Sequence, residues 1–128
     1  MILKVNRVTD QLPRTAEDLY YDAIERLADG RAAEAVDLFR AALAVNPNFL
    51  DARHGLIRAL DSAGEVDEGI ATALALIADQ PDDVLAWTSL SILYQHAGQV
   101  PEAEAASAKA KILGWKLELQ SKSAGAIE

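Results

Sequence analysis

The chain has 128 residues, no cysteine, and 20 acidic against 12 basic side chains, so its formal net charge is −8. The length fits one domain, and a hydrophobic content of 51% is too high for a disordered chain. The acidic balance disfavours nucleic acid as a partner, and the lack of cysteine excludes disulfides, thiol catalysis and Cys-type zinc sites.

Residues 1–14 precede the helical pattern and are predicted to form an N-terminal arm. Leu3 and Val5 alternate with polar neighbours, which is a weak strand signal. The arm is either a loosely ordered tail or a segment that packs on this chain or on a neighbouring copy. It lacks the features of a signal peptide, and no run in the chain approaches the ~20 apolar residues of a membrane helix. We therefore expect a cytoplasmic protein without a membrane partner.

Six segments then carry apolar residues at helical spacing. Thr15 and Asp18 predict a capping box at the start of the first helix. Pro47 and Pro81 end two of the segments, because the residue before a proline is driven out of helical geometry. The predicted helices cover 15–28, 32–45, 49–62, 66–79, 83–97 and 101–113.

The helices come in pairs, and the pairs repeat every 34 residues. Gly30, Gly64 and Gly98 stand at this period, each followed four residues later by a glutamate. A glycine at the end of a helix favours the left-handed conformation that caps it. Agreement of several columns at one period indicates an array of helical hairpins.

This pattern resembles the tetratricopeptide repeat, a family of 34-residue helix–turn–helix units. The third unit matches best, through Trp87, Leu90, Ser91, Tyr94, Gly98, Ala103 and Ala110. The resemblance implies an all-α, right-handed superhelical solenoid of three hairpins plus a short C-terminal cap. The hairpins would occupy about 15–48, 49–82 and 83–114.

Two details of packing follow from the register. Gly69 stands where alanine is usual, and Ile57 stands where a small residue is usual. We therefore expect the small Gly69 to make room for the large Ile57 where their two helices cross. Residues 115–128 are expected to form the cap and tail. Trp115 and Leu117 would cover the apolar side of the last hairpin as a short helix, and the chain would be disordered from about Ser123.

In the resembled family the first helices of the repeats line a concave groove that binds peptides. The residues of this chain in the same register come from all three units: Tyr20, Ile24, His54, Arg58, Leu85, Thr88, Ile92 and His96. The apolar members would anchor a partner, and polar contacts from Arg58 and His54 would fix the position of the bound segment along the groove. Two alternatives stay open, namely that some of these residues are ordinary core and that they serve self-association.

Catalysis is not expected. His54 and Asp51 are three residues apart, a spacing that most often gives a surface hydrogen bond, and His96 has no second metal ligand nearby in the sequence. No phosphate-binding loop, nucleophile elbow or zinc-protease motif occurs. We therefore expect no metal and no cofactor.

The charge is unevenly distributed. No Lys or Arg lies between Ala59 and Ala108, whereas nine acidic residues do. This acidic window is either a solvated surface or a docking face for a basic partner.

The sequence thus predicts a non-enzymatic module that binds a peptide or partner segment in its groove. One alternative is a homodimer built through the groove and the arm, and another is a small secretion-type chaperone.

Overall fold

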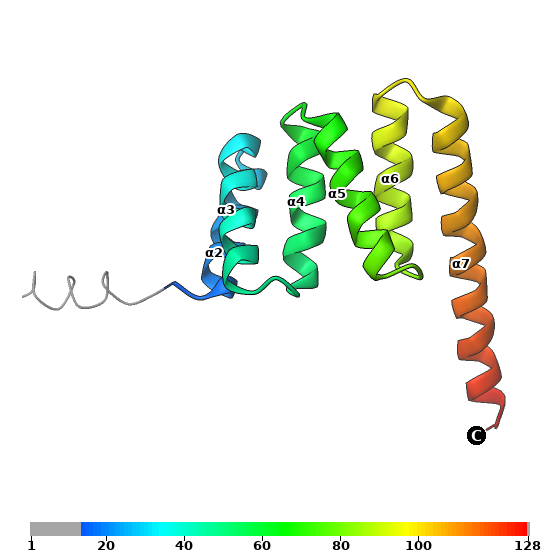
Figure 1. The fold of residues 1–128 in the computed structure, drawn as a ribbon. Coiled ribbons are helices and arrows are strands. Elements are labelled where there is room, and N and C mark those ends of the chain that lie inside the picture. Colours follow the sequence, from blue (N-terminus) through cyan, green and yellow to red (C-terminus); the bar gives the residue numbers. More distant parts are fainter. Residues whose placement is uncertain (1–13, 128) are drawn as a thin grey trace, which may run out of the picture.

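A computed structural model describes residues 14–127, and this part of the chain folds as a row of helices without any strand. Figure 1 shows the helices standing side by side, each antiparallel to its neighbour along the chain. The all-α, right-handed solenoid of three hairpins is confirmed. The predicted arm lies almost wholly outside the described residues. The helices are α2 (Ala16–Ala28), α3 (Ala32–Val45), α4 (Leu50–Ser62), α5 (Val66–Asp79), α6 (Val84–His96) and α7 (Val100–Ile127).

Local signals account for the helix boundaries. Thr15 and Asp18 form the predicted capping box, in which the Thr15 hydroxyl accepts from the Asp18 amide at 3.0 Å. Gly30, Gly64 and Gly98 all have φ between 75° and 80°. This left-handed conformation strains any residue with a Cβ, so glycine ends the first helix of each pair at the predicted position.

Close packing depends on two further glycines. A Cβ on Gly55 would overlap the ring of the fully buried Phe39. A Cβ on Gly69 would lie 2.8 Å from Leu93 Cδ2. The prediction that Gly69 makes room for Ile57 is therefore corrected. The large side chain next to Gly69 is Leu93 of α6, the first helix of the following hairpin.

The C-terminal segment differs in form from the expectation. It is helical, but it continues α7 without a break to Ile127, so the predicted disorder from Ser123 is not found. Trp115 is 63% exposed and Leu117 is 46% exposed, so neither side chain covers the last hairpin. Figure 1 shows the end of α7 extending well beyond the other helices. None of the helices within the described residues is long and apolar enough to span a membrane.

Candidate binding groove

The first helices of the three hairpins form one layer. α4 contacts both α2 and α6, and the eight groove residues predicted from the sequence all lie on these three helices. The second helices α3, α5 and α7 pack on them from the other side, where alanines such as Ala35 and Ala106 are buried at the crossings. The first-helix layer is therefore the surface on which to look for a site.

Two of the eight residues belong largely to the core. Tyr20 is half-buried, and its ring lies 6.0 Å from that of Phe39 and 5.1 Å from that of Phe49, measured between ring centroids. Ile24 is half-buried against the same hydrophobic cluster. Most of the apolar surface of both side chains is covered by this cluster, so little of it is left to contact a partner.

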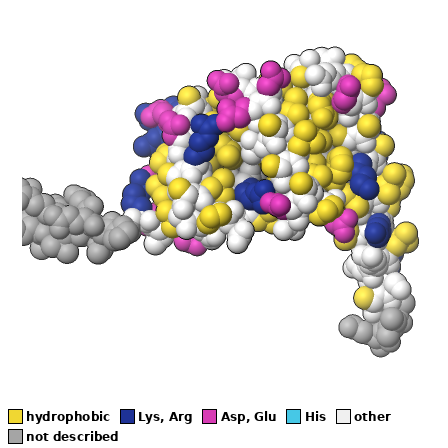
Figure 2. All heavy atoms as spheres, viewed as in Figure 1, with side chains coloured by type: hydrophobic (Ala, Val, Ile, Leu, Met, Phe, Trp, Pro, Cys, Tyr) yellow, Lys and Arg dark blue, Asp and Glu magenta, His cyan; other side chains and the backbone are white. Residues whose placement is uncertain are grey.

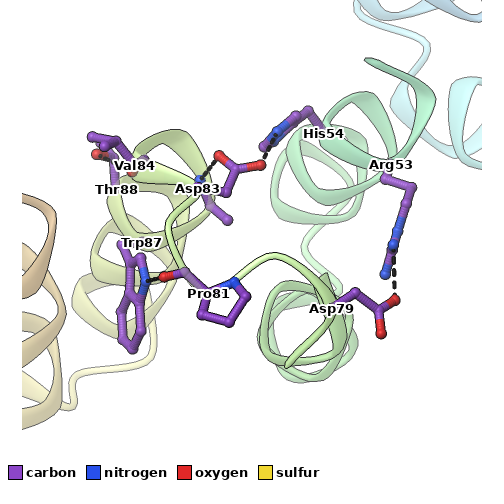
Figure 3. Close-up of polar contacts among 9 residues, drawn as sticks. Arg53, His54, Asp79, Pro81, Asp83, Val84, Trp87 and Thr88 are labelled. Atoms are coloured by element: carbon purple, nitrogen blue, oxygen red, sulfur yellow. Dashed lines mark hydrogen bonds and ion pairs between the residues drawn. The ribbon is translucent and has the colours of Figure 1, made fainter. Parts of the chain in front are cut away.

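His54 joins two helices instead of facing solvent. Its Nε2 donates to Asp83 Oδ2 at 2.8 Å, while Oδ1 of the same carboxylate accepts the Ala86 amide at 3.0 Å (Figure 3). Asp83 is the N-cap of α6, so the pair ties α4 to the start of the next first helix. Only 13% of the His54 side chain is exposed, and its buried Nδ1 has no hydrogen-bond partner among residues 14–127.

His96 makes the matching contact at the other end. Its Nδ1 donates to Asp61 Oδ1 at 2.7 Å, which joins the last turn of α6 to the last turn of α4. This pair is more open, because the His96 side chain is 53% exposed. Both histidines thus clamp the junction between α4 and α6, and the predicted pairing of His54 with Asp51 is replaced by one with Asp83.

Arg58 and Ile92 meet between the same two helices. They line a small cavity of about 60 Å³ together with Asp61 and Ser89. Arg58 is exposed and takes part in none of the ion pairs formed among residues 14–127. The guanidinium is therefore available to a ligand next to an apolar side chain.

A larger cleft of about 420 Å³ lies on the other side of α6, against α7. Ile92 and Thr88 line it from α6, and Lys111 and Ser107 line it from α7. The Thr88 hydroxyl donates to Val84 O of its own helix at 3.0 Å, so its hydrogen is used within α6. Ile92 thus borders both cavities and remains 43% exposed.

Lys111 and Ser107 were missed from the sequence because only first helices were considered. A signal for them existed: 34 residues earlier stand Ile77 and Ala73, which are buried under α6. Replacement of two core positions by polar residues in the last unit marks a surface that no other helix covers within residues 14–127. Leu85, at the start of α6, is 51% exposed and completes the set of apolar side chains on this helix that are open to solvent.

Acidic side chains gather along one edge of the molecule. Figure 2 shows them mainly along the upper edge in this view, where the turns between paired helices lie. Within the described residues, no group of three or more His, Asp or Glu side chains is placed to hold a metal ion. The chemistry that the first-helix layer offers is therefore apolar contact flanked by the cations Arg58 and Lys111.

Solved structures of other proteins share this arrangement of helices. A crystal structure of MamA superposes with a TM-score of 0.72 at 27% identity, covering 80% of this chain and 56% of that chain. The Yersinia enterocolitica type III secretion translocator chaperone SycD, crystallised as an alternative dimer, gives a TM-score of 0.74 at 20% identity. There the match covers 88% of this chain and 86% of SycD, and the likeness concerns the fold alone.

The chain spans little more than half of the MamA chain it matches. No curated protein sequence matches it. A family model described as tetratricopeptide repeat does match, over residues 26–91, from the end of α2 to the middle of α6. This range is slightly more than half of the chain and includes two of the three glycine-capped turns. The 34-residue period, the paired helices and this match agree that the chain belongs to the tetratricopeptide repeat family.

Proposed function

We propose that this chain is a non-enzymatic protein-binding module that captures a short segment of a partner on α6. The observation that carries the proposal is Ile92, which borders one cavity toward α4 and another toward α7 while staying 43% exposed. Exposed apolar side chains in a concave surface offer binding energy to a partner. Leu85 extends the apolar surface by two turns along the same helix.

The partner's chemistry follows from what flanks Ile92. Arg58 stands on one side and Lys111 on the other, so a carboxylate on the bound segment would meet a cation in either direction. An apolar side chain would enter the larger cleft, whose volume of about 420 Å³ accommodates one or two side chains. The proposed ligand is therefore a peptide with an apolar anchor next to Asp or Glu. Neither nucleic acid nor a cofactor takes part in this proposal, and the cytoplasmic location stays a prediction.

The test is selection of peptides from a random display library on the full chain, followed by binding measured by fluorescence anisotropy. We expect Leu85→Ser with Ile92→Ser to weaken the selected peptide at least tenfold, since each removes an exposed apolar contact worth about 1 kcal/mol or more. Leu74→Ser is the matched control, because Leu74 is 44% exposed but lies on the second helix α5. Unchanged binding by the double variant, or an equal loss in the control, would contradict the proposal.

A secretion-type chaperone is a specialised form of the same module. The observation that favours it is the match to SycD, which covers nearly the whole length of both chains. In that case the selected peptides would resemble amphipathic segments of a secreted client. The homodimer through groove and arm remains a further prediction, because the arm lies outside the described residues.

A further inference from the structure

The outer side of α7 carries a second apolar stripe. Its inner side packs on α6 through buried alanines and Leu113. On the opposite side Ile112, Trp115 and Leu119 are 56%, 63% and 66% exposed. With the exposed Ala105 and Ala108 they are spaced alternately by three and four residues. This is the spacing of the contact seam in a two-stranded coiled coil.

The stripe is long and has no partner within the described residues. Figure 2 shows apolar and basic side chains next to one another over the part of the molecule where Figure 1 places α7. The second half of α7 extends past α6. A helical segment as short as this half is only marginally stable in water when it has no tertiary contacts. A contact along the stripe would both cover it and stabilise the helix.

We propose that this stripe is the interface of a homodimer in which the α7 helices of two copies pair in antiparallel orientation. We call it the outer seam and define it as Ala105, Ala108, Ile112, Trp115, Leu119 and Lys122. The outer seam shares no residue with the peptide groove, which lies on the first helices and on the inner flank of α7. Lys111 stands between the two surfaces and borders both.

Sizes along the outer seam match when the helices run antiparallel. Centred between Ile112 and Trp115, the register places Ile112 against Trp115 of the second copy and Leu119 against Ala108 of the second copy. The aliphatic stem of Lys122 then covers Ala105 of the second copy. Each layer thus joins a larger side chain to a smaller one, as close packing between two helices requires.

Charges on one flank match as well. In the same register Lys111 lies beside Glu118 of the second copy, and symmetry makes this contact twice. A parallel pair would instead place Lys111 beside Lys116 of the second copy, where like charges repel. The other flank carries Lys109 and Lys116, and Lys109 is drawn away toward its own hairpin, where its Nζ lies 5.9 Å from the centroid of the Trp87 ring.

The net charge of the chain also points to α7. This helix holds four lysines against three glutamates, whereas the whole chain has a net charge of −8. Two copies would therefore meet at the part of the surface where their acidic character is lowest. Because the outer seam faces away from α6, the two solenoids stand on opposite sides of the helix pair. The contact is self-complementary and closes as a two-fold dimer.

The test is analytical ultracentrifugation of the full chain over a wide range of concentration, with circular dichroism to check helix content. We expect a concentration-dependent dimer, and a dissociation constant at least 100-fold higher for Ile112→Glu with Trp115→Glu. Leu74→Glu is the matched control and should dimerise like the natural chain, because Leu74 is also exposed, at 44%, but lies on α5. A natural chain that stays monomeric at all concentrations, or a seam variant that keeps its dimer, overturns the proposal.

A milder variant tests the orientation. Among residues 14–127 Lys111 takes part in no ion pair, whereas Glu118 pairs with Lys122 of its own helix at 3.4 Å. Lys111→Glu should therefore weaken the dimer about tenfold, and Lys111→Glu with Glu118→Lys should restore most of it. A stronger dimer for Lys111→Glu would mean parallel helices and would overturn the antiparallel arrangement.

The seam is distinguished from other contacts by two more variants. Leu85→Ser with Ile92→Ser should lose the selected peptide and keep the dimer. Loss of the dimer in Leu3→Ser with Val5→Ser would assign it to the arm and count against the seam.

Discussion

The α4–α6 junction and the open side of the last hairpin are built from the same repeat positions, 34 residues apart, yet only one of them is filled. At the junction Ala73 and Ile77 are buried under α6. The equivalent positions on α7 are Ser107 and Lys111, which line a cleft. The interior cavity at the junction measures about 60 Å³, and the cleft at the open end about 420 Å³.

At these two positions the side chain is apolar where another first helix follows, and polar on α7, which no further first helix follows within residues 14–127. Polar side chains thus stand on this side of α7 at positions where the preceding unit has core residues. This explains why Trp115 and Leu117 do not fold back over it. It also separates two kinds of exposed apolar surface: Ile92 borders the open cleft, and the outer seam lies on the far side of α7.

The largest effect is expected from placing the equivalent residue of the last hairpin at the junction. Ile57 is 1% exposed, and its equivalent in the last unit is Ser91. Ile57→Ser should lower the free energy of unfolding by about 3–5 kcal/mol, because it leaves a cavity and buries a hydroxyl. Urea unfolding followed by circular dichroism measures this. Ile92→Ser changes an exposed isoleucine in the same way and should cost less than about 1 kcal/mol, so equal losses would refute the comparison.

An intermediate effect should distinguish the two ends of the α4–α6 junction. Asp83 both caps α6 and holds the largely covered His54, so Asp83→Ala should cost about 2 kcal/mol. Asp61 holds only the half-exposed His96, and Asp61→Ala should cost less than about 1 kcal/mol. Thermal unfolding of the two variants side by side tests the order. A larger loss for Asp61→Ala would show that the exposed pair is the stronger tie.

Local features of this fold were predictable, and contacts between units were not. The capping box at Thr15 and the left-handed Gly30 depend on neighbouring residues alone, so the sequence pattern located them. His54 bonds to a residue 29 positions away, and no local pattern reports such a pair.

The extent of α7 could not be predicted for a related reason. The last helix was predicted to end at 113, but Gly114 lies within a continuous helix, and apart from its chain neighbours and the nearby backbone of that helix no described atom lies within 4 Å of where its Cβ would stand. A glycine ends a helix only when the following chain turns away, and no proline follows Gly114 to force that turn. Of the eight predicted groove residues, Tyr20 and Ile24 proved half-buried against the core because their degree of burial depends on Phe39 and Phe49 in other elements.

The smallest effect concerns a contact that exists only between units. Between α3 and α4, Ala35 and Ala59 are both fully buried. The equivalent residues between α5 and α6 are Gly69 and Leu93. Gly69→Ala gains up to about 1 kcal/mol of helix propensity but forces its Cβ against Leu93 Cδ2, so a net loss of about 1 kcal/mol is expected.

The sign should reverse when the neighbour is trimmed. In a Leu93→Ala background the space is open, and adding Gly69→Ala should stabilise the chain by about 0.5–1 kcal/mol. Gly114→Ala should stabilise by a similar amount in the natural chain, because nothing crowds that position. The measurement is urea unfolding of the four variants of the cycle. If Gly69→Ala had the same sign in both backgrounds, Leu93 would not be what requires glycine here, and a cause within α5 itself would have to replace it.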